Sequence, residues 1–287
     1  MAAKTKHIAT LDTSAVKPYS VSHSKMATFR RCRQQFKWKY IDKYFPPSSM
    51  GQQRGTSGHA ALARWHVDYD RTKAMDAAWE NWSNAGFSDN EDWQQLQQAL
   101  LRYFDWSADN DKFTLLVAEQ KFEIDYEVGE EKVQFIGYID GIVEENKQTW
   151  ILENKFLKRM DNTENTMDQQ VSLYMLAAHL MNYEAQGVIY NKVRMGSTKV
   201  AITEPVVRTR MHRNPQGISK IQDEMLIQIQ DMINFEQKGG GVYRNPTKDC
   251  SWDCPFHAAC LSMADDGQEP AEILQQISQI RSTDDNG

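Results

Sequence analysis

Three strand-like segments in the middle of the chain constrain its fold more than any other feature. They cover residues 114–128, 132–144 and 149–156, and two turn-like pairs, Gly129-Glu130 and Glu145-Asn146, separate them. Successive strands joined by such short turns form an antiparallel meander. The third segment contains the run Trp-Ile-Leu, which suits a strand buried inside a sheet. The chain is therefore expected to build a sheet around this meander.

Helical patterns lie on both sides of the meander. Apolar residues at spacings of three and four predict helices over residues 24–41, from about 56 through 65, 72–83, 91–107, 167–181 and 217–235. Two further strands are predicted over residues 187–193 and 200–210. A run of helices, a meander, and then alternating helix and strand predict one α/β domain with helical additions.

Two acidic side chains and a lysine stand out on the meander. Alternation along a strand places Glu153 and Lys155 on one face, and pairing of the second and third strands would bring Asp140 beside Glu153. The two carboxylates, with the backbone oxygen of Asn154, form a hard oxygen site for Mg²⁺ or Mn²⁺. Such an ion activates water for attack on a phosphodiester, and Lys155 would orient the water or offset negative charge. Taken alone, the same pattern also fits an ordinary strand pair with solvated charges.

Four short motifs occur in order along the chain. They are G-x-x-G-H at Gly55, Gly58 and His59, G-x-x-D-G around Asp140, E-x-K at Glu153 and Lys155, and Q-x-x-x-Y at Gln170 and Tyr174. As a set, they resemble the RecB-type nucleases of the PD-(D/E)XK superfamily, in the branch that includes AddB and the CRISPR-associated exonucleases. The resemblance covers roughly residues 22–260. It implies a restriction-endonuclease-like core, with a mixed central sheet, flanking helices, a helical N-terminal part and a cysteine-containing tail.

The resemblance also implies a role for each motif residue. His59, Asp140 and Glu153 would bind the metal ion, together with the backbone oxygen of Asn154. Asp140, Glu153 and Lys155 would be the catalytic residues, and Gln170 and Tyr174 would contact DNA. Glu119 matches a frequent carboxylate of the family only weakly, so it is left out of the expected site.

The chain has four cysteines: Cys32, Cys250, Cys254 and Cys260. In an intracellular protein such a compact set more often binds metal than forms disulfides, and thiolates suit both zinc and iron–sulfur clusters. In the nuclease branch that the chain resembles, one N-terminal cysteine and a C-terminal triplet hold a [4Fe-4S] cluster that staples the domain. The resemblance therefore implies such a cluster here. The sequence departs from the family pattern at two points: three residues separate Cys250 from Cys254 where two are common, and Arg33 follows Cys32 where proline is common. A zinc-stapled structural protein is the alternative.

The net charge of −6 is unevenly distributed. Residues 261–287 carry a net charge of −5, whereas residues 191–220 carry +6. Because phosphate binding depends on local basic surface, the overall charge does not exclude DNA as a partner. The expected organisation is a flexible arm (1–21), a nuclease domain (22–260) with a helical insertion at about 60–110, and an acidic tail (261–287). The absence of long apolar runs and of a signal-peptide pattern predicts a cytoplasmic protein with no membrane partner, in a bacterial or phage-infected cell.

The resemblance and the site residues together predict a metal-dependent DNA exonuclease, with some endonuclease activity, in recombination, repair or processing. The chain has no G-x-x-x-x-G-K-[ST] loop, so a helicase or recombination partner would supply any unwinding. The alternative is a catalytically silent, nuclease-like module that binds DNA or a partner protein. Ring-shaped oligomers occur among related nucleases, and an oligomer is compatible with the sequence.

Overall fold

The computed structural model describes residues 17–158, 160, 168–196, 202–264 and 269–280. Most of the expected flexible arm, and parts of the acidic tail, lie outside the described residues. The chain divides into two compact units. The first comprises residues 1–48, 125–135 and 224–287, and the second comprises residues 49–124 and 136–223. The domain limits expected from the sequence stay a prediction.

The predicted meander is confirmed, and it belongs to a mixed sheet. Its strands are β3 (Thr114–Val128), β4 (Glu131–Glu145) and β5 (Gln148–Leu157), followed by β6 (Ala185–Arg194) and β7 (Val206–His212). β3 pairs with β4, and the neighbouring strands then run in the order β4, β5, β6, β7. β5 is antiparallel to β4 and parallel to β6, and β7 is antiparallel to β6. In the first unit the short strand β1 (Tyr19–Val21) pairs in parallel with residues 133–135 of β4.

The hairpin between β4 and β5 turns at Asn146 and Lys147, one residue later than the sequence suggests. Both residues have positive φ angles, 52° and 64°. Two consecutive left-handed residues make a type I′ turn, whose twist matches that of the flanking strands. This turn fixes the register in which Gly141 lies opposite Leu152.

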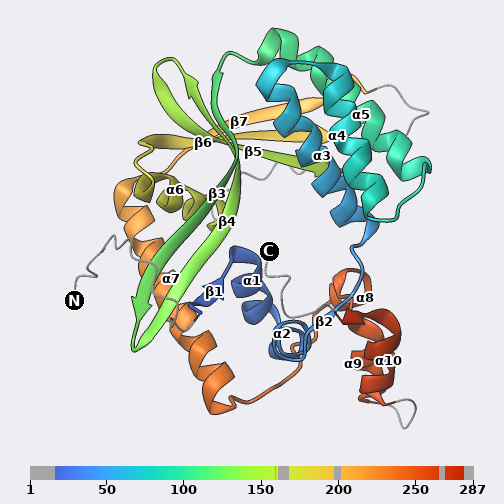
Figure 1. The fold of residues 1–287 in the computed structure, drawn as a ribbon, viewed down its shortest axis with the longest axis vertical. Helices are drawn as coiled ribbons and strands as arrows, with labels where there is room; N and C mark the ends of the chain where they lie inside the picture. Colours follow the sequence, from blue (N-terminus) through green and yellow to red (C-terminus); the bar gives the residue numbers. More distant parts are fainter. Residues whose placement is uncertain (1–16, 159, 161–167, 197–201, 265–268, 281–287) are drawn as a thin grey trace. The chain divides into compact units, whose positions relative to one another are not determined.

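Three helices of the second unit pack together. They are α3 (Met50–Asp68), α4 (Arg71–Asn84) and α5 (Glu91–Asn110), and Figure 1 shows them gathered at the carboxyl ends of β5 and β6. Their core contains Trp65, Trp82 and Tyr103, and it continues onto Val193 at the end of β6. The predictions for α4 and α5 are confirmed.

Helix α3 begins at Met50, so the start predicted near residue 56 is wrong. The Ser49 side chain accepts a hydrogen bond from the Gln52 N–H, and the Gln52 side chain accepts one from the Ser49 N–H. This reciprocal capping box satisfies two of the free donors at the helix start. His59 consequently lies in the middle of α3 and not at its first turn.

Two glycines of α3 provide a matched pair of stability predictions. A Cβ at Gly58 would overlap the ring of Phe156, whereas one at Gly55 would meet nothing within 4 Å. Alanine in a helix interior is favoured over glycine by about 1 kcal/mol, and overpacking costs about 1–3 kcal/mol. We expect Gly58→Ala to lower the free energy of unfolding and Gly55→Ala to raise it, as measured by urea denaturation. Equal effects of the two substitutions would contradict the close packing at Gly58.

The remaining helices and strands of the second unit also follow the sequence. Helix α6 (Gln169–Leu180) confirms the predicted helix over 167–181, and eight consecutive residues of it are buried. A helix buried on all sides must lie within the core of its unit. β6 confirms the strand predicted over 187–193. β7 starts only at Val206, so the strand predicted over 200–210 begins too early, because residues 202–205 are not in a strand. The first two residues of the strand predicted over 200–210 lie outside the described residues.

The first unit contains α1 (His23–Arg31), α2 (Arg33–Phe36) and the π-helical turn η1 (Lys37–Ile41). One continuous helix over 24–41 is therefore wrong. Cys32 has an extended backbone, with φ −162° and ψ 121°, and it ends α1 while capping α2. The apolar spacing continues across this break because both short helices face the long helix α7 (Pro215–Lys238), through Phe29 and Phe36 against Phe235.

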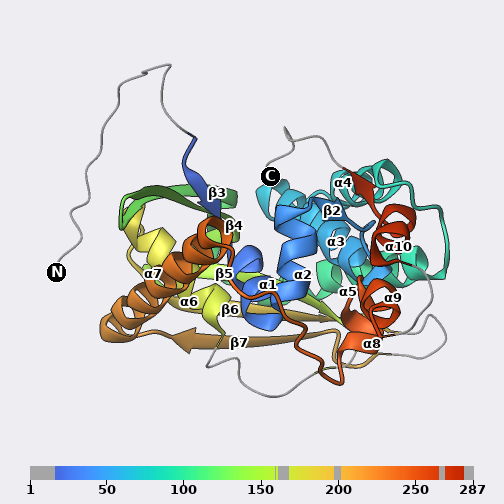
Figure 2. The same ribbon diagram turned by 90° about the horizontal axis from the view of Figure 1, so that it is seen from below.

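The C-terminal part of the first unit consists of short elements. These are α8 (Cys250–Asp253), α9 (His257–Ser262), α10 (Pro270–Ile277) and β8 (Gln279–Ile280). β8 pairs with β2 (Tyr44–Phe45), a short strand from the N-terminal part of the same unit. The three helices lie together in both views (Figures 1 and 2). Trp38, Phe256, Ala259 and Leu274 form a small core beneath them.

The structure confirms an α/β fold with a mixed central sheet and flanking helices. Among the described residues, every helix is too short or too polar to cross a bilayer.

Candidate metal and catalytic site

The pairing of β4 with β5 places Asp140 at the centre of a polar cluster in the second unit. One carboxylate oxygen of Asp140, Oδ2, accepts hydrogen bonds from the backbone N–H of Asn154 at 2.8 Å and from its Nδ2 at 3.4 Å. The other oxygen, Oδ1, lies 3.0 Å from Nδ1 of His59 on α3. Asp140 is thus held from two elements, with one oxygen used by β5 and the other directed at His59.

His59 faces this carboxylate from the middle of α3. Burial lowers the pKa of His59, but Asp140 and the other carboxylates of the site outweigh burial and raise that pKa to about 9. This raised value reflects a concentration of negative charge around the imidazole. A bound cation would relieve the same charge, and a neutral imidazole is itself a common metal ligand.

Glu119 joins the cluster, although it was left out of the site expected from the sequence. Ligand atoms of His59, Glu119 and Asp140 all lie within 4.8 Å of one another. Glu119 has a φ of 47° inside β3, a left-handed conformation that interrupts the regular alternation of the strand. Burial raises the pKa of Glu119, and the charge of Asp140 raises it further. The structure therefore brings Glu119 next to two residues of the expected site, and its weak match to a family carboxylate was the available signal.

Glu153 lies on β5 and is only 2% exposed. One of its oxygens contacts the ammonium group of Lys155, and the other, Oε2, is buried without a hydrogen-bond partner. Burial and the charge of Asp140 together raise the pKa of Glu153 to about 7, although Lys155 lowers it. Glu153 is not part of the group within 4.8 Å that contains Asp140, so among the described residues it forms a second, adjacent carboxylate position.

Lys155, Gln170 and Tyr174 form a line of contacts that leads away from Glu153. The ammonium group of Lys155 donates to Oε1 of Gln170 at 3.3 Å, and Nε2 of Gln170 donates to the hydroxyl of Tyr174 at 2.7 Å. Burial lowers the pKa of Lys155, but the charges of Glu153 and Asp168 outweigh burial and raise it. Lys155 is therefore expected to stay protonated at neutral pH.

Asp168 fixes the start of α6 and thereby Gln170. Its side chain accepts from the Gln170 N–H at 2.9 Å and from the Tyr190 hydroxyl at 3.1 Å. An aspartate at this position satisfies a free N–H and favours the positive end of the helix dipole. Asp168 is not one of the motif residues, and the helix predicted over 167–181 already includes it, whereas the observed helix starts one residue after it.

The basic segment predicted over 191–220 offers less free positive charge than its composition suggests. Three of its arginines form ion pairs: Arg208 with Asp111 at 2.5 Å, Arg210 with Glu145 at 2.6 Å and Arg194 with Glu204 at 3.6 Å. Two of these partners, Asp111 and Glu145, lie outside the segment, so two of its six net positive charges are neutralised within the second unit.

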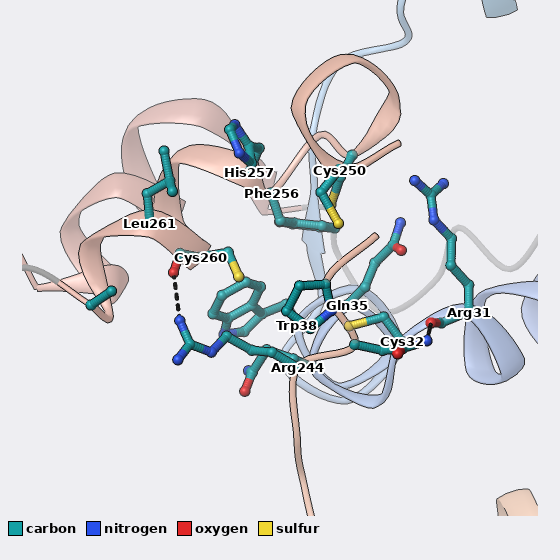
Figure 3. Close-up of a pocket in the computed structure, with 15 residues that line it drawn as sticks. Arg31, Cys32, Gln35, Trp38, Arg244, Cys250, Phe256, His257, Cys260 and Leu261 are labelled. Carbon is teal, nitrogen blue, oxygen red and sulfur yellow. Dashed lines mark hydrogen bonds between the residues drawn. The ribbon is translucent and has the colours of Figure 1, made fainter. Parts of the chain in front are cut away.

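The four cysteines meet in the first unit. Together they line one cavity of about 160 Å³, and all four are free thiols. Figure 3 shows the sulfur atoms of Cys32, Cys250 and Cys260 directed into a common space above Trp38. The extended backbone at Cys32 presents one cysteine from the N-terminal helices, and the segment from α8 to α9 presents the other three. Burial raises the pKa of Cys254, so a bound cation would favour its thiolate form.

A sequence model of the PD-(D/E)XK nuclease superfamily matches residues 20–261. A protein from Eubacterium rectale named "Putative exonuclease" has a similar solved structure, with a TM-score of 0.49 and 8% identity over 81% of this chain and 92% of that chain. The crystal structure of SSO0001 has a TM-score of 0.43 and 10% identity, over 87% of this chain and 89% of that chain. No curated protein sequence matches the chain.

Proposed function

Because the chain belongs to the PD-(D/E)XK nuclease superfamily, we propose that it is a metal-dependent DNA exonuclease that hydrolyses phosphodiester bonds at DNA ends. The observation that carries this proposal is the cluster of His59, Glu119 and Asp140 beside the buried Glu153 and its ion-pair partner Lys155. We place the activity in DNA recombination, repair or processing in the cytoplasm, where a helicase partner would supply unwinding.

The donor set of the second unit suits Mg²⁺ or Mn²⁺. It offers carboxylate oxygens and one imidazole, and the buried Oε2 of Glu153 has no hydrogen-bond partner. Hard divalent cations prefer such oxygen ligands. We propose His59, Glu119, Asp140 and Glu153 as the ligands, with the backbone oxygen of Asn154. When bound, the ion would lower the pKa of a water molecule and polarise the scissile phosphate.

The surrounding side chains supply the remaining requirements of hydrolysis. Lys155 brings a fixed positive charge next to Glu153, which would offset the charge that develops on the phosphate. Gln170 and Tyr174 extend from Lys155 along α6, and we propose that they hold the DNA strand. The hydrogen bond between these two side chains fixes their relative orientation, and positioning of this kind lowers the entropy cost of reaction.

The cysteine cavity of the first unit suits a [4Fe-4S] cluster. Four thiols line it, and the apolar side chains of Trp38 and Phe256 form part of its wall. Four thiolates are the ligand set of such clusters, and they are also a ligand set of structural zinc. We propose the iron–sulfur cluster, which would tie Cys32 to the segment 250–260 within the first unit. The role that we propose for it is structural, as the link between these two segments.

Digestion of linear and covalently closed circular DNA tests the proposed activity. With Mg²⁺ or Mn²⁺, we expect linear DNA to be degraded and circular DNA to be largely spared, and we expect EDTA to abolish the reaction. Equal cleavage of both forms would identify an endonuclease. DNA binding without cleavage under either metal would overturn the proposal in favour of a catalytically silent binding module.

A further inference from the structure

We propose that Asn191 and Arg208 are positioning residues that hold the Asp140 carboxylate in its metal-binding orientation through Asn154. The proposal rests on the assignment of Asp140 as a metal ligand. Neither residue belongs to the four sequence motifs, and neither touches Asp140 directly. Both lie in the second unit, on β6 and β7, which are the strands beyond β5 in the sheet.

A continuous chain of hydrogen bonds joins these residues to the site. Nε of Arg208 donates to Oδ1 of Asn191 at 2.6 Å, and Nδ2 of Asn191 donates to Oδ1 of Asn154 at 3.0 Å. Asn154 then donates to Oδ2 of Asp140 from its backbone N–H and from Nδ2. Asn154 and Asn191 are 2% and 0% exposed, so water does not compete for these bonds.

Arg208 and Asp140, at the two ends of this hydrogen-bond chain, determine the direction in which its hydrogen bonds are donated. A guanidinium group can only donate hydrogen bonds, and an ionised carboxylate can only accept them. Arg208 therefore turns the oxygen of Asn191 toward itself and the amide group of Asn191 toward Asn154. For the same reason the oxygen of Asn154 faces Asn191, and its amide group faces Asp140. Reversing either amide would place two donors or two acceptors against each other.

The contacts of Arg208 hold its side chain in place at the start of the hydrogen-bond chain. It pairs with Asp111 at 2.5 Å, donates to the backbone oxygen of Asn110 at 2.9 Å, and stacks against the rings of Trp106 and Phe113. Its side chain is 6% exposed, and that of Asp111 is 3% exposed. Removing two charged groups from water costs free energy, so a buried ion pair often adds little net stability to the fold. Stability alone therefore does not explain why Arg208 and Asp111 are buried here.

As a result, the two carboxylate oxygens of Asp140 have different roles in the site. Oδ2 is occupied by two donors from Asn154, so the carboxylate cannot rotate freely. Oδ1 is left facing His59, in the group of atoms that lie within metal-binding distance of one another. Hydrogen-bond partners of metal ligands typically contribute about 10- to 100-fold in metal affinity.

Binding of Mn²⁺ in the absence of DNA tests the inference, with the loss of the free-ion electron paramagnetic resonance signal as the readout. We expect Asn191→Ala to raise the dissociation constant of Mn²⁺ by about 10- to 100-fold. Asn191→Asp keeps an acceptor for Arg208 but removes the donor to Asn154, and we expect a weakening in the same range. If the alanine variant does not fold, the aspartate variant, which has nearly the same shape, carries the test.

Tyr103→Phe is the matched control. The Tyr103 hydroxyl accepts from the second hydrogen of the Asn191 amide at 3.2 Å and contacts His66, but it is not on the path to Asp140. We expect this variant to lose thermal stability while it binds Mn²⁺ like the wild type. Unchanged Mn²⁺ affinity in both Asn191 variants would overturn the inference and leave the proposed function standing. Failure of the wild type to bind Mn²⁺ would overturn the metal site itself, and the inference with it.

Discussion

Lys155→Ala is expected to reduce the rate of DNA cleavage at saturating metal by roughly 10²- to 10³-fold, the usual effect of removing one group that stabilises transition-state charge. Lys155 contacts the carboxylate of Glu153 and stays cationic because Glu153 and Asp168 raise its pKa. A fixed positive charge at this position would stabilise the transition state, in which the attacked phosphate gains negative charge, more than the bound substrate. We therefore expect the loss to appear in kcat, with a smaller change in KM.

Lys158→Ala is the control for this variant. Lys158 follows directly after β5, but its side chain is 55% exposed and forms an ion pair with Asp92 at 3.4 Å, which is not one of the site carboxylates. We expect this control to cleave DNA within a few-fold of the wild-type rate. A Lys155→Ala protein that is folded, binds DNA and cleaves at the wild-type rate would remove Lys155 from the catalytic group.

The second large effect is expected in the first unit. Cys254→Ser should reduce the iron content from about four atoms per chain to nearly none, because a cluster of this kind needs its four thiolates. The visible absorbance of the anaerobically purified protein should be lost with the iron. Since the cluster would link Cys32 to the segment 250–260, we also expect a large drop in thermal stability. In small domains, the free energy of binding a structural metal contributes directly to the free energy of folding.

Ser251→Ala provides the matched control, because Ser251 is an exposed neighbour within α8 that does not line the cavity. It should keep its iron and its stability. Stoichiometric zinc in a colourless wild-type protein would contradict the iron–sulfur cluster and support the zinc alternative. Wild-type protein that retains full stability without any metal would contradict a metal staple of either kind.

The sequence predicts the central sheet well because its signals there are local. Two-residue alternation and short turns were enough to predict β3, β4 and β5, and this pairing brings Asp140 next to β5. Glu119 could not be placed in the same way. Its contribution depends on a left-handed residue inside a long strand, and regular alternation does not foresee such a conformation.

Other features depend on contacts between segments far apart in the chain. The hydrogen-bond chain from Arg208 to Asp140 requires β5 to pair with β6 and β6 with β7, so it cannot be predicted from a short sequence motif. The break at Cys32 is similar, because the apolar spacing runs across it without interruption. By contrast, the start of α3 at Met50 is predictable from the sequence, since Ser49 and Gln52 have the spacing of a capping box.

Digestion of end-labelled DNA with Mg²⁺ or Mn²⁺, by wild type beside Asp140→Ala, tests the central claim most directly. We predict that the wild type releases label from DNA ends, and that the variant is inert while its thermal unfolding and its content of any bound iron are unchanged. Cleavage by both proteins at the same rate would show that the cluster around Asp140 is not the active site. A wild type that binds the labelled DNA but never releases label would contradict the nuclease assignment itself.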